Sequence, residues 1–99
     1  MVDIGELQAL THSIGEHALM ALGVENVTGM QATLNPTDLV CILQIALRAN
    51  SDQSKLDAIT ALGDVEDLFF NEAVISFQFV DEIMKSSEPA MSPLQYSYS

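Results

Sequence analysis

The spacing of apolar residues divides the chain into segments, and the first segment is helical. From Asp3 to Gly23, apolar residues recur every three or four positions, which is the spacing of one helix face. Asp3 is a suitable N-cap with Glu6 three residues later, and Gly23 can adopt the left-handed conformation that ends a helix. The pattern predicts a helix over residues 3–23, followed by a connector over residues 24–33.

A second helix is predicted after the connector. Asn35 can cap it, Pro36 suits its first position because no amide donor is needed there, and Asp38 favours the positive end of the helix dipole. The residues from there to Ala49 are almost all apolar, with one narrow polar strip. A helix this apolar has to be surrounded, so we expect it at the centre of the fold.

Two further helices are predicted in the second half of the chain. A short one covers residues 51–62 and stops at Gly63, and the longest covers residues 65–85 with apolar side chains over more than half of its circumference. Within it, residues 75–79 alternate apolar and polar side chains, which is also typical of a strand. No partner strand is predicted elsewhere in the chain, so helix is the favoured interpretation.

The predicted fold class is all-α, a small bundle of about four helices over residues 1–85. Residues 86–99 contain prolines and several serines and show no helical period, so they are expected to form a disordered tail. Tyr96 and Tyr98, with Ser92 and Pro93, fit either an unstructured end or a docking or modification segment, and the unstructured end is favoured.

Charge is the most unusual feature of the composition. Fourteen acidic residues face three basic ones, for a formal net charge of −11, although 48% of the residues are hydrophobic. Three scattered bases cannot neutralise a phosphate backbone or an anionic membrane surface, so neither is an expected partner. The chain shows no positively charged leader and no run of about 20 apolar residues, so a soluble, cytoplasmic protein is expected.

Candidate chemistry is sparse. Cys41 is the only cysteine and lies in an apolar segment, where it is expected to fill the core. His12 and Glu16 are four residues apart on one predicted helix face, while His17 lies about 100° further round, so the three do not converge on a metal ion. No nucleophile–base pair or phosphate-binding loop is evident. We expect no cofactor, no metal and no enzymatic activity.

Acidic residues gather in the second half of the chain. Asp64, Glu66 and Asp67 are interpreted as acids at a helix N-terminus, because they lack the ligand pattern of a calcium loop. Glu72 falls within the apolar arc of the predicted last helix. It is either exposed at the edge of that arc, paired with one of the three bases, protonated, or placed at an interface with another chain.

These features favour a non-enzymatic protein-interaction module, such as an adaptor, an assembly or export chaperone, or an inhibitor. The partner would be basic or have an apolar groove, and the last helix would supply both the apolar contact and the charge selection. The residues predicted to contact the partner are Phe69, Glu72, Ala73, Phe77, Val80, Asp81 and Met84.

Two alternatives remain open. A subunit of a helical polymer or oligomer would also combine apolar helices with few bases. An acidic mimic of nucleic acid, which inhibits a basic nucleic-acid-binding protein, would share the charge pattern.

Overall fold

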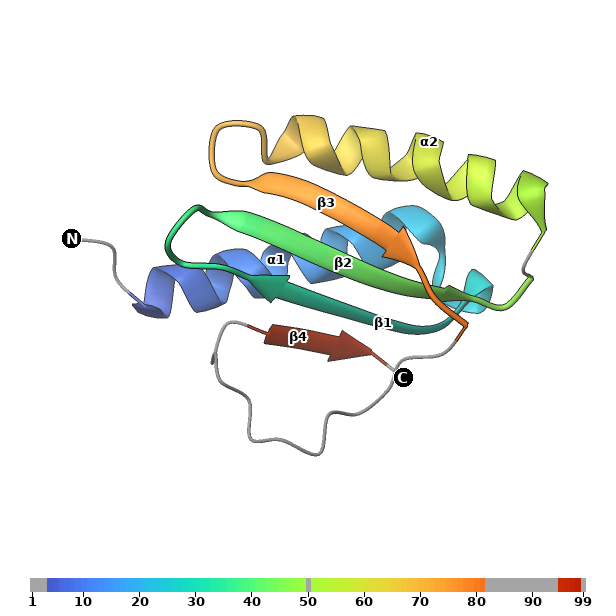
Figure 1. Ribbon diagram of the computed structural model, residues 1–99, viewed down its shortest axis with the longest axis horizontal. Coiled ribbons are helices and arrows are strands. Elements are labelled where there is room, and N and C mark those ends of the chain that lie inside the picture. The colour runs from blue at the N-terminus through green and yellow to red at the C-terminus, as the bar shows by residue number, and fades with distance from the viewer. Residues whose placement is uncertain (1–3, 50, 82–94, 99) are drawn as a thin grey trace.

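The computed structural model describes residues 4–49, 51–81 and 95–98, and within them it shows an α/β fold (Figure 1). A four-stranded mixed sheet packs against two α-helices, with α1 behind the sheet in the figure and α2 along its β3 edge, so the predicted all-α helical bundle is wrong. The elements in chain order are α1 (Ile4–Leu22), the short 3-10 helix η1 (Val24–Asn26), β1 (Val27–Leu34), β2 (Val40–Leu47), α2 (Asp52–Leu68), β3 (Val74–Phe79) and β4 (Gln95–Tyr98).

The strand order across the sheet is β3-β2-β1-β4. β1 and β2 form an antiparallel hairpin, and β4 pairs antiparallel with the other edge of β1. β3 runs parallel to β2, and α2 provides the crossover between these two strands. β3 and β4 are therefore the outer strands among the described residues.

The core lies between the sheet and the helices. In Figure 1 the strands pass in front of α1, and α2 contacts α1 in the same helix layer. The view therefore looks onto the opposite face of the sheet, which no described helix covers. The larger buried side chains at the centre of the core are Ile14, Met30, Leu34, Leu43, Ile45 and Leu62. Neither described helix is long and apolar enough to cross a membrane.

The prediction of the first helix is confirmed. α1 ends at Leu22, and Gly23 follows with a φ of 88° and donates its N–H to the Leu19 carbonyl oxygen at 2.9 Å. This is the left-handed conformation that glycine adopts without steric cost. Asp3, the predicted N-cap, lies outside the described residues.

The predicted helix start after Asn35 is wrong, because these residues form the turn of the β1–β2 hairpin. The Asn35 side-chain oxygen accepts the Thr37 N–H at 2.9 Å, and the Asp38 carboxylate accepts the Val40 N–H at 3.1 Å. Leu39 has a φ of 57°, which no helix interior allows. Short polar side chains that bond the backbone two residues on stabilise turns as well as helix caps. The same residues therefore fit either a hairpin turn or the start of a helix.

The predicted connector and central helix are therefore the strands β1 and β2. In β1 the buried side chains of Met30, Ala32 and Leu34 alternate with the half-buried Gln31 and Thr33. β2 lies between two other strands, and its inward side is fully buried, so its sequence is an almost continuous apolar run. Such a run does not distinguish a buried strand from a buried helix.

The two predicted helices of the second half are also corrected. Ser51 caps α2 as expected, since its hydroxyl accepts the Ser54 N–H at 3.2 Å, but the helix continues through Gly63 to Leu68. Asp64, Glu66 and Asp67 therefore lie near the C-terminal end of a helix instead of starting one. Their carboxylates face the unfavourable end of the helix dipole.

The long helix over residues 65–85 does not exist in the described part of the chain. Its first residues complete α2, and residues 74–79 form β3 as their alternation indicated. Lys85 lies outside the described residues, as do residues 86–94 of the predicted tail. Residues 95–98 of that tail form β4, with Tyr96 opposite Ala32 and Tyr98 opposite Met30 on β1.

Candidate interaction surface

The seven predicted contact residues do not share one helix face. The structure places them as follows: Phe69 and Ala73 buried in the turn after α2, Glu72 exposed in the same turn, Phe77 half-buried on β3, Val80 half-buried and Asp81 exposed after β3, and Met84 outside the described residues. Their binding role stays a prediction, but Phe69, Ala73 and Phe77 pack in or against the core and not on a common outer surface.

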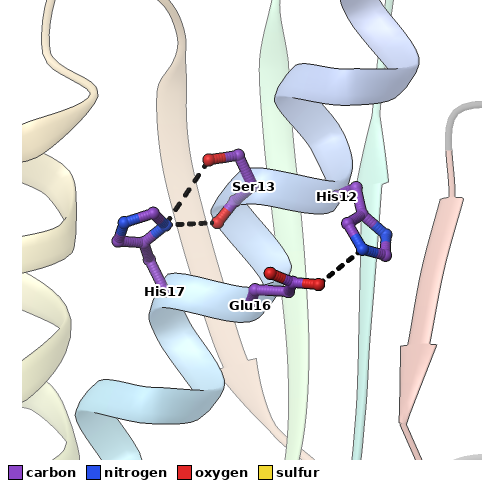
Figure 2. A network of polar contacts seen from close by, with 4 residues as sticks. All are labelled: His12, Ser13, Glu16 and His17. Carbon is purple, nitrogen blue, oxygen red and sulfur yellow. Dashed lines mark hydrogen bonds and ion pairs between the residues drawn. The ribbon is translucent and has the colours of Figure 1, made fainter.

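His12, Glu16 and His17 form two separate contacts on α1, which Figure 2 shows. His12 Nε2 lies 2.6 Å from a carboxylate oxygen of Glu16, and both side chains are more than half exposed. His17 turns the other way, with Nδ1 2.8 Å from the Ser13 carbonyl oxygen, and its ring meets the edge of Phe69. His12 and His17 thus contact residues one turn away within α1, and His17 also contacts Phe69 at the end of α2.

No metal centre forms among the described residues, where no three histidine, cysteine or acidic side chains gather closely enough to hold an ion. Cys41 is fully buried, and burial raises the pKa of its thiol to about 11. A thiol in this environment stays protonated near neutral pH and does not act as a nucleophile. Its placement in the core agrees with the interpretation from the sequence.

A small pocket of about 240 Å³ lies where the end of α1, η1, the end of β2 and the start of α2 meet. Arg48 lines it and is held in place, because its Nε donates to the Glu25 carbonyl oxygen at 2.9 Å. The acidic side chains of Glu25 and Asp57 line it too. Because charges of both signs stand at an open rim, the pocket does not select a class of ligand.

The uncovered face of the sheet has a more specific composition. None of the four strands contains an aspartate, glutamate, lysine or arginine, although the chain has 17 of these residues in total. We call the outward-pointing residues of the strands the uncharged face: Gln31, Thr33, Val40, Ile42, Gln44, Val74, Ser76, Gln78, Gln95 and Ser97. They alternate along each strand with residues that point to the helices.

Strand register arranges these side chains in rows across the sheet. Gln44 lies opposite Gln31 on β1 and beside Gln78 on β3, and Ser97 on β4 extends the row. The neighbouring row contains Gln95 on β4, Thr33 on β1, Ile42 on β2 and Ser76 on β3. Residues paired across adjacent strands have Cβ atoms about 5 Å apart, so each row is a continuous strip of side chains.

The uncharged face offers both apolar contact and hydrogen bonding. Ile42 is 45% exposed and Val74 is 63% exposed, so apolar surface remains in contact with water. Among the described residues, no side chain or backbone group forms a hydrogen bond with the side-chain amides of Gln31, Gln44 or Gln78. Each amide can donate and accept, so together they can bond a partner's backbone or its polar side chains.

The sequence held a signal for this surface. Between Asn26 and Leu47 the only charged residue is Asp38, which lies in the hairpin turn. In a chain of net charge −11, an uncharged stretch this long indicates strands whose outer face avoids carboxylates. We missed it because the stretch was divided into a connector and a helix.

Comparison of the chain with protein-family models, with curated proteins and with solved structures found no match.

Proposed function

We propose that this chain is a non-enzymatic protein-interaction module that binds its partner through the uncharged face. The observation that carries the proposal is the partition of charge. The described acidic residues lie on helices and turns, whereas every outward-pointing residue of the sheet is neutral. Depletion of charged residues is what distinguishes the buried centre of a protein interface from the remaining surface.

The shape and chemistry of the face favour a protein over a small ligand. The pocket of about 240 Å³ described above has none of the residues of this face in its lining, whereas small-molecule sites are concave and enclosed. The amide and hydroxyl groups of the face suit the backbone and polar side chains of another protein. The acidic residues of α1 and α2 lie on the helices, away from this face. Their negative charge disfavours nucleic acid and, at longer range, orients a basic partner.

Of the two alternatives, self-assembly stays a prediction. Mimicry of nucleic acid stays a prediction, and no observation on the described residues favours it over partner binding.

Charge placed in the middle of the uncharged face tests the proposal. Gln44→Glu keeps the size and shape of the side chain but adds one carboxylate at the centre of the glutamine row. Burying that carboxylate without a counter-charge costs several kcal/mol, so we expect capture of the partner to fall at least about tenfold. The measurement is quantitative mass spectrometry of proteins retained by the tagged full chain from its native source.

Gln8→Glu is the matched control, because Gln8 is exposed on α1 and receives the same chemical change on the opposite layer. Circular dichroism confirms that both variants fold. Equal capture by the Gln44→Glu variant and the unmodified chain, or loss in the Gln8→Glu variant alone, contradicts binding through this face.

A further inference from the structure

The uncharged face changes in character along its strands. Where β2 and β3 begin, its residues are apolar: Val40 lies beside Val74 in the strand register, and Ile42 follows on β2. Further along the same strands lies the row that contains Gln44 and Gln78. Figure 1 shows the β1–β2 turn and the α2–β3 turn at the apolar end of the sheet, which we call the turn end.

Exposed apolar side chains gather at the turn end. Val74 and Ile42 are both exposed, although they are large apolar residues. Phe70, which is 78% exposed, lies in the turn before β3. The Ala73 N–H bonds the Phe69 carbonyl oxygen at 3.0 Å and closes this turn, so Phe70 stays near the start of β3. We call the exposed or half-buried apolar residues of the turn end the anchor patch: Val40, Ile42, Phe70 and Val74.

Two carboxylates border the anchor patch. The Asp38 carboxylate accepts the Val40 N–H at 3.1 Å, so its charge lies directly beside the patch. Glu72 is exposed in the turn before β3. The two described bases, Arg48 and Lys55, lie at the opposite end of the sheet, after β2 and near the start of α2. Within the described part of the chain, the turn end of the face therefore carries negative charge and no positive charge.

These carboxylates select among the classes of partner. Phosphates of a nucleic acid or of an anionic membrane would face them without an opposing base, which is repulsive. A second copy joined patch to patch about a two-fold axis would bring the same carboxylates close to their own equivalents. The surface that fits has apolar side chains to cover the patch and basic side chains to pair with its rim.

We infer that the anchor patch receives an aromatic or aliphatic side chain of a protein partner, and that lysine or arginine residues beside that side chain pair with Asp38 and Glu72. Uncharged polar residues of the partner then lie over the row of Gln44 and Gln78, whose amides can bond them. The inference rests on the proposed function, because it assumes that the uncharged face is the interaction surface. It adds the chemistry of the partner and places the partner's basic part at the turn end.

Random peptides test this chemistry before the natural partner is known. A phage-displayed library of random peptides, each of about 12 residues, is selected on the immobilised full chain. We expect the retained sequences to combine a large apolar residue with lysine or arginine, and to hold fewer acidic residues than the starting library. Retention of no sequence, or of sequences without an excess of bases over acids, overturns the inference.

An acidic chain attracts basic peptides to any part of its surface, so variants are needed to locate the binding. Phe70→Ser/Val74→Thr removes apolar contact from the anchor patch, and threonine keeps the strand preference of valine. The dissociation constant of a retained peptide, measured by fluorescence anisotropy, should rise at least about tenfold. Met20→Ser/Val24→Thr is the matched control, because Met20 is also 78% exposed and Val24 follows it at the same spacing, at the end of α1. An equal loss of affinity in this control contradicts binding at the patch.

Neutral variants test the contribution of the rim. Asp38→Asn/Glu72→Gln removes both charges, while the asparagine oxygen can still accept the Val40 N–H. We expect the peptide's dissociation constant to rise about threefold or more at low salt, and the difference to shrink as salt is added. Glu25→Gln/Asp57→Asn removes the same charge at the opposite end of the sheet and should have a smaller effect. Equal effects of the two pairs would mean that only the net charge of the chain matters, which overturns the inference.

Partner capture from the native source separates this inference from the proposed function. Loss of capture in both the Gln44→Glu and the Phe70→Ser/Val74→Thr variants, with the Met20→Ser/Val24→Thr control unaffected, supports both. If Gln44→Glu alone lowers capture, the uncharged face remains the interaction surface but the anchor patch is not its contact, so only the inference fails. Circular dichroism checks that each variant folds, and the neutral variants give an independent test that leaves the apolar residues in place.

Discussion

The Tyr96 ring of β4 lies in the space that a side chain on Gly15 of α1 would fill. A Cβ atom built on Gly15 would lie 2.6 Å from Tyr96 Cγ, well inside contact distance. The same ring meets the His12 ring edge-on, with 5.0 Å between their centroids. Gly15 therefore positions β4, because the close approach of this aromatic ring to the helix requires a residue without a side chain.

We predict that Gly15→Ala releases β4 from the sheet while the rest of the fold remains. The added methyl group has to displace the Tyr96 ring, which weakens the packing of β4 on α1. The higher helix propensity of alanine stabilises α1 by about 1 kcal/mol and offsets part of that lost packing energy. Amide exchange of residues 95–98 should accelerate at least about tenfold, measured by nuclear magnetic resonance. Unchanged exchange in β4 would show that the ring moves aside without cost.

Gly63→Ala is the matched control for this prediction. Gly63 lies within α2, and a Cβ atom built on it meets nothing within 4 Å. The same substitution should therefore raise the free energy of unfolding by about 0.5–1 kcal/mol and leave exchange in β4 unaltered.

The second prediction concerns the contact between α2 and the rest of the core. Leu62 is fully buried, so Leu62→Ala should lower the free energy of unfolding by about 2–5 kcal/mol through lost burial and the cavity that remains. Leu56→Ala provides the comparison, because Leu56 is 58% exposed on the same helix and its loss should change stability by less than about 1 kcal/mol. Urea unfolding measures both, and similar losses in the two variants would mean that α2 packs differently.

The third prediction follows from Cys41. Burial raises the pKa of this thiol from 9.0 to about 11, so the folded state holds the proton more tightly than the unfolded chain does. Its contribution to stability is fully present below pH 9 and is lost as the pH rises to about 11. At 1.36 kcal/mol for each pKa unit, the free energy of unfolding should fall by up to about 3 kcal/mol over this interval.

Other groups titrate in the same range, so the comparison is with Cys41→Ala. Urea unfolding of both proteins at several pH values isolates the thiol, because only the difference between the two curves reports Cys41. A difference that stays constant from pH 8 to pH 11 would show that the thiolate is accommodated in the folded state.

The parts of the fold that sequence patterns predicted correctly are those determined locally. α1 was recognised from its apolar spacing and from Gly23, and the start of α2 from Ser51, because a helix and its caps form within a short segment. The hairpin turn was missed because Asn35 and Asp38 bond nearby backbone amides in turns and in helix caps alike.

That one error led to the others. Once β2 had been assigned to a helix, the alternating residues 75–79 had no strand to pair with and were assigned to a helix in turn. Strand pairing depends on residues far apart in the sequence, so each missed strand removes the evidence for its neighbours. The candidate surface was lost in the same way, because Gln31, Gln44 and Gln78 form a row only when three strands are in register.

The strand order has a consequence for how the protein is made. β4 lies beside β1 in the sheet, although Gln95 and its partner Thr33 are about 60 residues apart in the chain. At about 5–20 residues per second, the ribosome needs about 3–12 seconds to add that length. During this interval β4 has not yet been made, so each newly made chain passes through a period in which the second edge of β1 is open to other proteins in the cell.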